Sequence, residues 1–320
     1  MHNSSDKKIK EYTLAFYNLE NLFDTKNDPK ILDDDFTEHS EKKWNNKRFR
    51  KKIRNLGQVI SQIGVRDIFH PPVLVGVAEV ENNYVLKELV NSKFLKDKNY
   101  DFVHIDSPDE RGIDTALLYR KEYFTIVKKE AICLYLKNEF GVRDYTRDIL
   151  YVQGILENEK IHILVNHWPS RRAGAEETAY KRYAAAEKNK EIISKIIEEE
   201  PNAKIILMGD FNDDPSSESI KNLVGSDFYN PMEQLHTKYS GTLSYRGRWN
   251  LFDQIILSNN FLQQYGNSFR FKAAKIFDAK NLKEFKGRNK GNPFRTFVGR
   301  KYRGGISDHF PVYGIFTIHP

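Results

Sequence analysis

The sequence predicts a fold of the mixed α and β class (α+β). Apolar runs of about four to eight residues that stop at turn-forming residues are typical of buried strands, and such runs recur along the whole chain. Segments in which apolar residues recur every third or fourth position are typical of amphipathic helices, and they lie between some of these runs. No internal repeat and no linker rich in glycine, proline or serine divides the 320 residues.

Each predicted strand is an apolar run bounded by polar or turn-forming residues. The run 205–208 is typical, because four apolar residues stop abruptly at Gly209. The predicted strands, in chain order, are residues 11–19, 73–78, 102–105, 115–119, 149–156, 161–165, 205–208, 252–257, 268–271 and 306–318, with a strand-rich region at 123–136.

Four segments have helical spacing. In residues 46–64 the apolar residues lie three to four positions apart, and basic residues occupy the outer face. The longest segment, residues 175–199, is closed by Pro201. Shorter helices are predicted at residues 84–90 and 216–224.

Composition restricts the class of protein. With 30% charged residues and a mean hydropathy of −0.65, the chain has no apolar run near the roughly 20 residues that cross a bilayer. Cys133 is the only cysteine, so no intrachain disulfide forms, which suits the cytoplasm. Residues 1–10 are expected to be a flexible N-terminus, without the apolar region of a signal peptide. The sequence as given therefore predicts a cytoplasmic protein, with export of a trimmed chain as the alternative.

Positive charge is concentrated in two stretches. Residues 279–305 carry a net charge of +8 and residues 41–54 a net charge of +7, whereas the whole chain carries only +7. This predicts a polyanionic partner, although a solvated helix face and a loop would give the same pattern. Residues 279–305, here called the basic segment, also contain aromatic residues that either stack on nucleic-acid bases or anchor the segment to the core. These are Phe285, Phe294, Phe297 and Tyr302.

Polar residues directly follow several apolar runs. Asp210 and Asn212 come one residue apart after the run 205–208, so a carboxylate and an amide are presented together at a strand end. An ordinary Asx turn has the same sequence. Comparable clusters at four other places favour one common polar site: residues 18–21, 79–82, 166–169 and 307–309.

This set of motifs, in this order, resembles the endonuclease/exonuclease/phosphatase superfamily and, within it, the deoxyribonuclease I branch. Gly-Asp-Phe-Asn at 209–212 and Ser-Asp-His at 307–309, with Glu79 upstream, are highly specific as a set, and the resemblance spans Asn18 to His309. It implies a four-layer α/β/β/α sandwich of two packed β-sheets flanked by helices. It also implies a single catalytic domain over residues 11–320.

The resemblance implies a divalent-metal-dependent hydrolase of phosphate esters. Glu79 is the expected first metal ligand, with Glu20, Asn18 and Asp308 on the metal or phosphate side. Mg²⁺ is the expected ion because it prefers oxygen ligands and is usually held by one or two carboxylates. Mn²⁺ and Ca²⁺ are alternatives. For Glu20 and Asn18, a solvated acid and a strand-end turn are the structural alternatives.

The resemblance also implies roles in the reaction. Asp210 would orient or deprotonate the attacking water, and Asn212 would hold that water or a phosphate oxygen. His309 would donate a hydrogen bond to the phosphoryl oxygens, and Asp253 would fix its tautomer and raise its basicity. A solvent-facing acid is the alternative for Asp253.

His167 matches the second histidine of the deoxyribonuclease I branch, which serves the leaving-group side. In that branch an acid from an Arg-acid dipeptide accompanies it, so Asp148, which follows Arg147, is its expected partner. A satisfied structural histidine is the alternative. The exonuclease III branch carries Tyr-x-Pro-Asn where this chain has His-Trp-Pro-Ser at 167–170. This departure counts against a dedicated abasic-site enzyme.

Three residues are expected on the substrate side. Arg111 lies in a segment that resembles the substrate-lining segment of the family and would grip a phosphate with its fork of donors, with a loop arginine as the alternative. Asn166 and Arg147 are expected to contact substrate as neighbours of the catalytic residues. Arg171 and Arg172 are weaker neighbours of the site.

These observations favour a Mg²⁺-dependent endonuclease that hydrolyses DNA, with RNA as an alternative, acting as a monomer without protein partners. A phosphoesterase of the same fold that acts on phospholipid or phosphoinositide head groups would use the same catalytic residues, so these residues do not discriminate. We expect a membrane-active enzyme to show an exposed apolar hairpin and an export signal, and the sequence indicates neither. A non-catalytic nucleic-acid-binding module would lack some of the catalytic residues, all of which are present.

Overall fold

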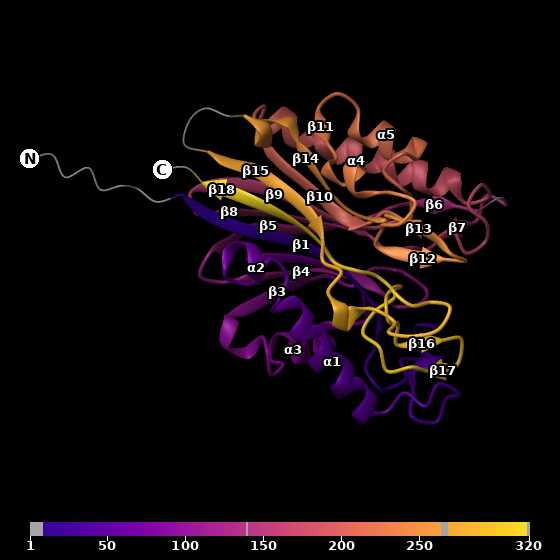
Figure 1. The fold of residues 1–320 in the computed structure, drawn as a ribbon. Coiled ribbons are helices and arrows are strands. Elements are labelled where there is room, and N and C mark those ends of the chain that lie inside the picture. Colours follow the sequence, from indigo (N-terminus) through magenta and orange to yellow (C-terminus); the bar gives the residue numbers. More distant parts are fainter. Residues whose placement is uncertain (1–8, 139, 264–267, 319–320) are drawn as a thin grey trace, which may run out of the picture.

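The computed structural model describes residues 9–138, 140–263 and 268–318. Two six-stranded β-sheets pack face to face, and helices cover the outer face of each (Figure 1). Helices α1 (Asn46–Ile60), α2 (Val65–Ile68) and α3 (Asn83–Val90) lie outside the first sheet, and α4 (Ala179–Glu199) and α5 (Glu218–Val224) lie outside the second. The predicted four-layer α/β/β/α sandwich is confirmed.

The first sheet is mixed, with the strand order β15-β18-β1-β2-β4-β3. Near its centre, β1 (Lys10–Leu22) pairs parallel with β2 (Leu74–Val80) and antiparallel with β18 (Val312–Ile318). The remaining strands are β15 (Phe269–Ile276), β4 (Asp114–Arg120) and β3 (Tyr100–His104).

The second sheet has the order β11-β14-β10-β9-β8-β5. Here β10 (Lys204–Asp210) pairs parallel with β9 (Glu159–His167) and antiparallel with β14 (Asp253–Ser258). The remaining strands are β11 (Phe228–Tyr229), β8 (Ile149–Leu156) and β5 (Phe124–Ile132).

Short elements complete the described structure. The two-stranded ribbons are β6 (Leu136–Lys137) with β7 (Arg143–Asp144), β12 (Leu243–Tyr245) with β13 (Arg248–Asn250), and β16 (Phe297–Val298) with β17 (Lys301–Tyr302). The 3₁₀ helices are η1 (Asp34–Phe36), η2 (Lys96–Lys98), η3 (Pro231–Leu235), η4 (Asn259–Leu262) and η5 (Lys280–Leu282). The ribbon β16–β17 lies in the basic segment, beside the loop that joins β1 to α1 (Figure 1).

Apolar layers hold the sandwich together. Between the sheets, Phe16 of β1, Ile163 of β9 and Met208 of β10 belong to one buried cluster. Side chains alternate along a strand, so the neighbours of these residues face the helices instead. Tyr17 of β1 belongs to the buried cluster under α1 and α3, and Leu207 of β10 belongs to the buried cluster under α4 and α5. Strands buried on both faces are continuous apolar runs, which is why the sequence pattern located them.

Some predicted boundaries differ from the observed ones. The first helix ends at Ile60 rather than at residue 64, and Gly64 has a φ of 72°, outside helical space. The last strand begins only at Val312, because residues 306–311 form a loop of the site described below. The flexible terminus expected at residues 1–10 lies outside the described residues except for its last two residues.

Strand pairing brings the key strand ends to one edge of the sandwich. β1 and β2 run in the same direction, and so do β9 and β10. In this register Asp210 lies beside His167 of β9 and Asp253 of β14, and Asn18 lies beside the residue that precedes Glu79. The two sheets therefore present polar residues at the same end. Within the described residues, none of the helices is long and apolar enough to span a bilayer.

Candidate active site

The strand ends that carry the site bend sharply. Glu20, Glu79 and Asn212 have φ angles of 51°, 62° and 48°, a conformation that is uncommon for residues other than glycine. The pairing register also shifts between Asn18 and Leu22 of β1, and again in β2 around Glu79. Bulges re-aim side chains and are frequent next to functional sites. Here they coincide with two of the predicted metal-side carboxylates.

These strand ends surround a cavity of about 280 Å³. Most of the predicted site residues line it: Glu20, Glu79, Arg111, His167, Asp210, Asn212, Asp308 and His309. Asn18 and Asp253 lie behind this lining and hold parts of it, as described below. Asn166, Arg147 and Asp148 do not line the cavity.

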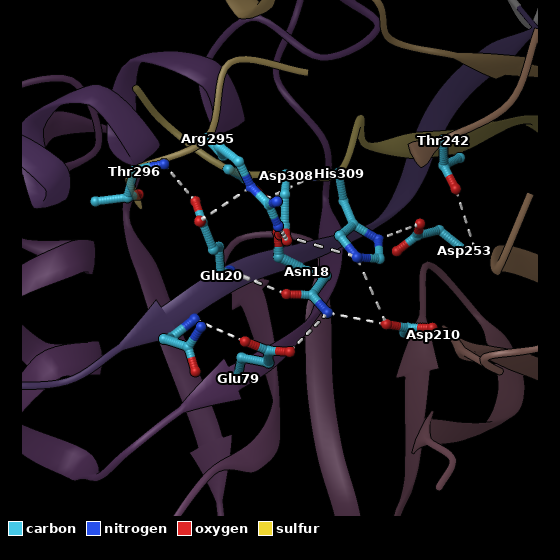
Figure 2. Close-up of polar contacts among 12 residues, drawn as sticks. Asn18, Glu20, Glu79, Asp210, Thr242, Asp253, Arg295, Thr296, Asp308 and His309 are labelled. Carbon is cyan, nitrogen blue, oxygen red and sulfur yellow. Dashed lines mark hydrogen bonds and ion pairs between the residues drawn. The ribbon is translucent and has the colours of Figure 1, made fainter. Parts of the chain in front are cut away.

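Asp210 lies at the centre of the site. Its Oδ1 accepts a hydrogen bond from the N–H of Asn212 (2.9 Å), and its Oδ2 accepts one from Nδ2 of Asn18 (2.9 Å; Figure 2). The Nε2 atoms of His167 and His309 each lie 3.9 Å from Oδ2. An Asx turn is therefore formed, as one interpretation predicted, while the second oxygen of the same carboxylate faces two histidines.

The environment of Asp210 shifts its ionisation. Burial raises the pKa of Asp210 to about 6; His309 opposes the rise, and Asp253 adds to it. At neutral pH the carboxylate is therefore largely ionised. A pKa just below the operating pH suits a general base.

His309 and Asp253 form the predicted pair. Nδ1 of His309 lies 2.7 Å from Oδ2 of Asp253, which is fully buried. Burial alone would lower the pKa of His309, but the ion pair with Asp253 and the charges of Asp210 and Asp308 outweigh it and raise this pKa well above its usual value. The ring is held protonated, with Nε2 3.9 Å from both Asp210 and Asp308.

His167 has the opposite charge state. Burial, together with the charges of nearby arginines and of His309, lowers the pKa of His167 well below its usual value. Its Nε2 lies 3.9 Å from Oδ2 of Asp210 and 4.0 Å from Oε1 of Glu79. The site thus contains one neutral and one protonated imidazole.

The expected pairing of His167 with Asp148 is not formed. Among the described residues, neither Nδ1 of His167 nor Oδ1 of Asp148 has a hydrogen-bond partner. The carboxylate of Asp148 lies near Leu134 and Arg143 instead. Neighbouring residues of an extended chain point to opposite sides, and the preceding residue, Arg147, is the one that turns toward the end of β9.

Asn166 and Arg147 have structural contacts in place of the predicted contact with substrate. Asn166 is fully buried, and its Oδ1 accepts hydrogen bonds from Nε1 of Trp168 (3.0 Å) and from Nδ2 of Asn189 in α4 (2.8 Å). Arg147 donates to the carbonyl of Trp168 (2.8 Å) and forms an ion pair with Asp109 (3.1 Å). Asn166 faces α4 because the following residue on the strand faces the cavity.

Arg111 lines the cavity as predicted. Its Nη2 donates to Oδ1 of Asn21 (2.5 Å), and the N–H of Asn21 donates to Oε2 of Glu79 (2.7 Å). Asn21 had only been part of a strand-end cluster in the sequence. In the structure it connects the arginine to the predicted metal ligand.

Glu20 anchors the basic segment. Its Oε2 accepts a hydrogen bond from the N–H of Thr296 (2.6 Å; Figure 2), and its Oε1 accepts one from the N–H of Phe297 (3.4 Å). The buried Lys52 of α1 donates to the carbonyl of Glu20 and to Oγ1 of Thr296. Burial, with the charge of Asp308, raises the pKa of Glu20 to about 7. These contacts give Glu20 an anchoring role, and its role as a metal ligand stays a prediction.

Arg295 is a site residue that the sequence analysis missed. It lines the cavity from the basic segment and forms an ion pair with Asp308, while its Nε lies 3.9 Å from Oε1 of Glu20 (Figure 2). Burial would raise the pKa of Asp308, but His309 and Arg295 outweigh it and lower this pKa. The only sequence signal was the net charge of the segment, which does not tell which of its bases turns inward.

Aromatic residues of the basic segment pack against the core. The ring of Phe297 lies 5.9 Å from that of Trp44, and the guanidinium of Arg48 lies 4.3 Å over the ring of Tyr302. The anchoring alternative therefore holds for Phe297 and Tyr302. Phe285 differs, with 67% of its surface exposed.

A family model described as the endonuclease/exonuclease/phosphatase family matches residues 13–317. The chain belongs to this family. Members of the family are phosphoric ester hydrolases. No curated protein sequence matches the chain significantly.

Solved structures share the fold of this family member. A humanised D. rerio TDP2 with 14 mutations is 16% identical, with a TM-score of 0.58 over 96% of this chain and 98% of that chain. A mannosyl-6-phosphatase from Bacteroides thetaiotaomicron is 19% identical, with a TM-score of 0.58 over 96% of this chain and 100% of that chain. An endonuclease/exonuclease/phosphatase family protein from the same organism is 18% identical, with a TM-score of 0.57 over 98% and 100%. At these identities the likeness concerns the fold alone.

The endonuclease/exonuclease/phosphatase family implies a divalent metal ion, and the cavity fits one. Oxygen is the ligand that hard divalent cations prefer, and four carboxylates line the cavity: Glu20, Glu79, Asp210 and Asp308. Asp308 is balanced by Arg295, and Glu20 is bound by backbone N–H groups. Glu79 is part-exposed and takes a hydrogen bond from one backbone N–H, so it is the carboxylate best placed to hold the ion.

A tighter group of candidate ligands does not fit as well. Asp210, Asp253 and His309 have ligand atoms within 4.8 Å of one another. However, His309 is held protonated by Asp253, and a protonated imidazole has no lone pair for a metal. These three residues are better suited to proton transfer and hydrogen bonding than to metal binding.

Proposed function

We propose that this protein is a divalent-metal-dependent phosphodiesterase that hydrolyses DNA as an endonuclease, by in-line attack of water. The proposal is carried by one observation. The ionised carboxylate of Asp210 lies 3.9 Å from the neutral His167 and 3.9 Å from the protonated His309, in one cavity. A base, a neutral donor and a cationic donor thus surround the space for one phosphate.

Asp210 would take the proton of the attacking water. Asn18 and the N–H of Asn212 hold both oxygens of this carboxylate in a fixed orientation. The side-chain amide of Asn212 donates to the carbonyl of Trp168 (2.9 Å), which leaves its side-chain oxygen to accept a hydrogen bond from the water. A positioned base with a matched pKa typically contributes about 10²- to 10⁴-fold in rate.

The two histidines would stabilise different oxygens. His309, which Asp253 holds protonated, would donate Nε2–H to a phosphoryl oxygen on which negative charge grows. His167 would donate a hydrogen bond on the leaving-group side, as the family resemblance implies. Arg111, which lines the same cavity, would add a fixed positive charge.

Glu79 would hold the metal ion, with Asp308 and Asn18 beside it. A divalent ion in this place would neutralise phosphate oxygens and support the departing oxygen. Asn21 fixes one oxygen of Glu79 through its N–H (2.7 Å). We propose Mg²⁺ as the ion, with Mn²⁺ and Ca²⁺ as alternatives.

The two basic stretches support a nucleic-acid substrate because they meet beside the cavity. Arg48 and Lys51 of α1 lie over Tyr302 of the basic segment, at 4.3 and 5.9 Å from the ring centre. Lys42 lies 5.9 Å from the ring centre of Phe297 and lines the cavity. A positive surface next to a phosphate site favours a polyanion. D. rerio TDP2, whose fold is similar, is described in a complex with single-strand DNA product.

The test is nicking of supercoiled plasmid by the purified protein with Mg²⁺, with and without EDTA. We expect nicked and then linear plasmid in Mg²⁺ and intact plasmid in EDTA. Plasmid that stays supercoiled in Mg²⁺, Mn²⁺ and Ca²⁺ would remove the endonuclease proposal.

One observation favours a second candidate, a phosphoesterase of lipid head groups. The β6–β7 hairpin exposes Phe140 (80%) and Val142 (60%), so the expectation that the chain lacks an exposed apolar hairpin is wrong. Vesicles that contain phosphatidylinositol 4-phosphate test this candidate. This candidate is favoured if the protein releases the head group, leaves plasmid intact and loses head-group release in the Phe140→Ser variant. The Phe285→Ser variant is the matched control and should keep this activity.

A further inference from the structure

A second cavity of about 260 Å³ adjoins the candidate active site. Ser170 and Arg172 line both cavities. They lie in the loop between β9 and α4, directly after the strand that ends at His167. A group bound in the second cavity is therefore a close neighbour of a group bound at the active site.

Three cationic side chains line this second cavity: Arg147, Arg172 and Lys181. Arg147 is paired with Asp109, and Lys181 is paired with Asp144. Within the described part of the chain, the guanidinium of Arg172 makes no hydrogen bond or ion pair, whereas its neighbour Arg171 is bound to an aspartate. The charge of Arg172 is therefore left for a ligand, at the point where the two cavities meet.

The start of α4 borders this cavity. Thr178, which precedes this 21-residue helix, lines the cavity, and its side chain does not cap the helix. Its hydroxyl donates instead to the carbonyl of Gly174 (2.6 Å). The N–H groups at the start of a helix carry a partial positive charge that favours phosphate groups.

We infer that the second cavity binds a second phosphate of the substrate, next to the phosphate that is hydrolysed. An arginine binds a phosphate through two parallel hydrogen bonds, and Arg172 is placed between the two positions. The inference rests on the proposed function. It narrows the substrate of the enzyme to a compound that carries a second phosphate next to the phosphate that is hydrolysed. The basic surface beside the first cavity favours a polynucleotide, in which every phosphate has such a neighbour. A bisphosphorylated head group offers the same chemistry.

A pair of substrates that differ by one phosphate tests this inference. They are the p-nitrophenyl ester of thymidine 5′-phosphate and the same ester with a 3′-phosphate, each assayed with Mg²⁺. We expect the second phosphate to lower KM about tenfold with little change in kcat, the scale of one charge-assisted hydrogen-bonded contact. Arg172→Ala should remove this preference, so that the two esters have equal KM values in the variant. The matched control is Arg66→Ala, which removes an exposed arginine of α2.

Binding measurements separate this inference from the proposed function. Calorimetry compares thymidine 5′-monophosphate with thymidine 3′,5′-bisphosphate, and neither requires turnover of a diester. The subsite is supported if the bisphosphate binds more tightly than the monophosphate and Arg172→Ala abolishes this difference. If this holds but neither ester is hydrolysed, only the proposed function fails. Equal binding of the two nucleotides, or a preference that survives in Arg172→Ala, overturns the subsite. Preference for inositol 1,4-bisphosphate over the nucleotide would identify a head group as the source of the second phosphate.

Discussion

Single residues take their chemistry from the neighbours that hold them. His309 and His167 are both buried and both lie 3.9 Å from Asp210, yet one is held protonated and the other neutral, because only His309 has a buried aspartate at Nδ1. The sequence motifs located these residues. A strand-end motif also placed Asn166 at the site, because such a motif does not tell which face of the strand a residue occupies. The family resemblance placed Asp148 there, from an Arg-acid dipeptide whose acid turns elsewhere in this chain.

Asn166→Ala tests the structural role of Asn166. The substitution leaves the buried donors of Trp168 and Asn189 without their acceptor, which costs about 1–3 kcal/mol for each group left unpaired. We expect a lower melting temperature with KM unchanged. A raised KM at unchanged stability would restore Asn166 to the substrate side.

His167→Ala tests the neutral histidine. We expect kcat to fall by about 10- to 100-fold, less than for loss of the base, because a neutral donor supplies one hydrogen bond and no charge. Steady-state kinetics on a nitrophenyl phosphodiester measure the loss, and circular dichroism checks the fold. Unchanged kcat would make His167 a structural residue.

Elements differ in how far pattern alone predicts them. Strands such as β10 and helices such as α1 were predicted because their apolar spacing is set by the faces that they bury. The basic segment was predicted only as a charged loop. Its position depends on single contacts from distant residues, such as Glu20 to Thr296 and Lys52 to Thr296. Contacts of this kind leave no periodic signal in the sequence.

Glu20→Gln tests the anchoring of the basic segment. The amide keeps one acceptor oxygen in place of two, so one backbone N–H loses its partner and the segment should open more often. We expect trypsin to cleave within residues 279–305 several times faster than in the unmodified protein. Calorimetric Mg²⁺ affinity should change little. An unchanged cleavage rate with a large loss of Mg²⁺ affinity would make Glu20 a metal ligand instead.

At the scale of the whole molecule, the two packed sheets determine where the site lies, because both present their polar strand ends at the same edge of the sandwich. The order of layers followed from the family resemblance, since local pattern does not tell which strands pair. The uneven distribution of positive charge is also a property of the whole molecule. The two basic stretches lie far apart in the chain but meet where α1 contacts the basic segment.

The dependence of activity on salt tests the basic surface. Binding through many phosphates releases counterions, so kcat/KM on plasmid should fall by about 10-fold or more between 50 and 200 mM salt. Cleavage of a nitrophenyl diester with one phosphate should change little over the same range. Parallel curves for the two substrates would contradict a polyanion-binding surface.

The most direct test of the account is the turnover of Asp210→Asn on bis-p-nitrophenyl phosphate with saturating Mg²⁺. Asp97→Asn, an exposed acid outside the site, is the matched control, and equal melting temperatures confirm that both variants are folded. We predict that Asp210→Asn lowers kcat by about 10²- to 10⁴-fold with KM nearly unchanged, because the base is lost and the other contacts remain. A folded Asp210→Asn variant that keeps the kcat of the control would contradict the central claim that Asp210 is the base.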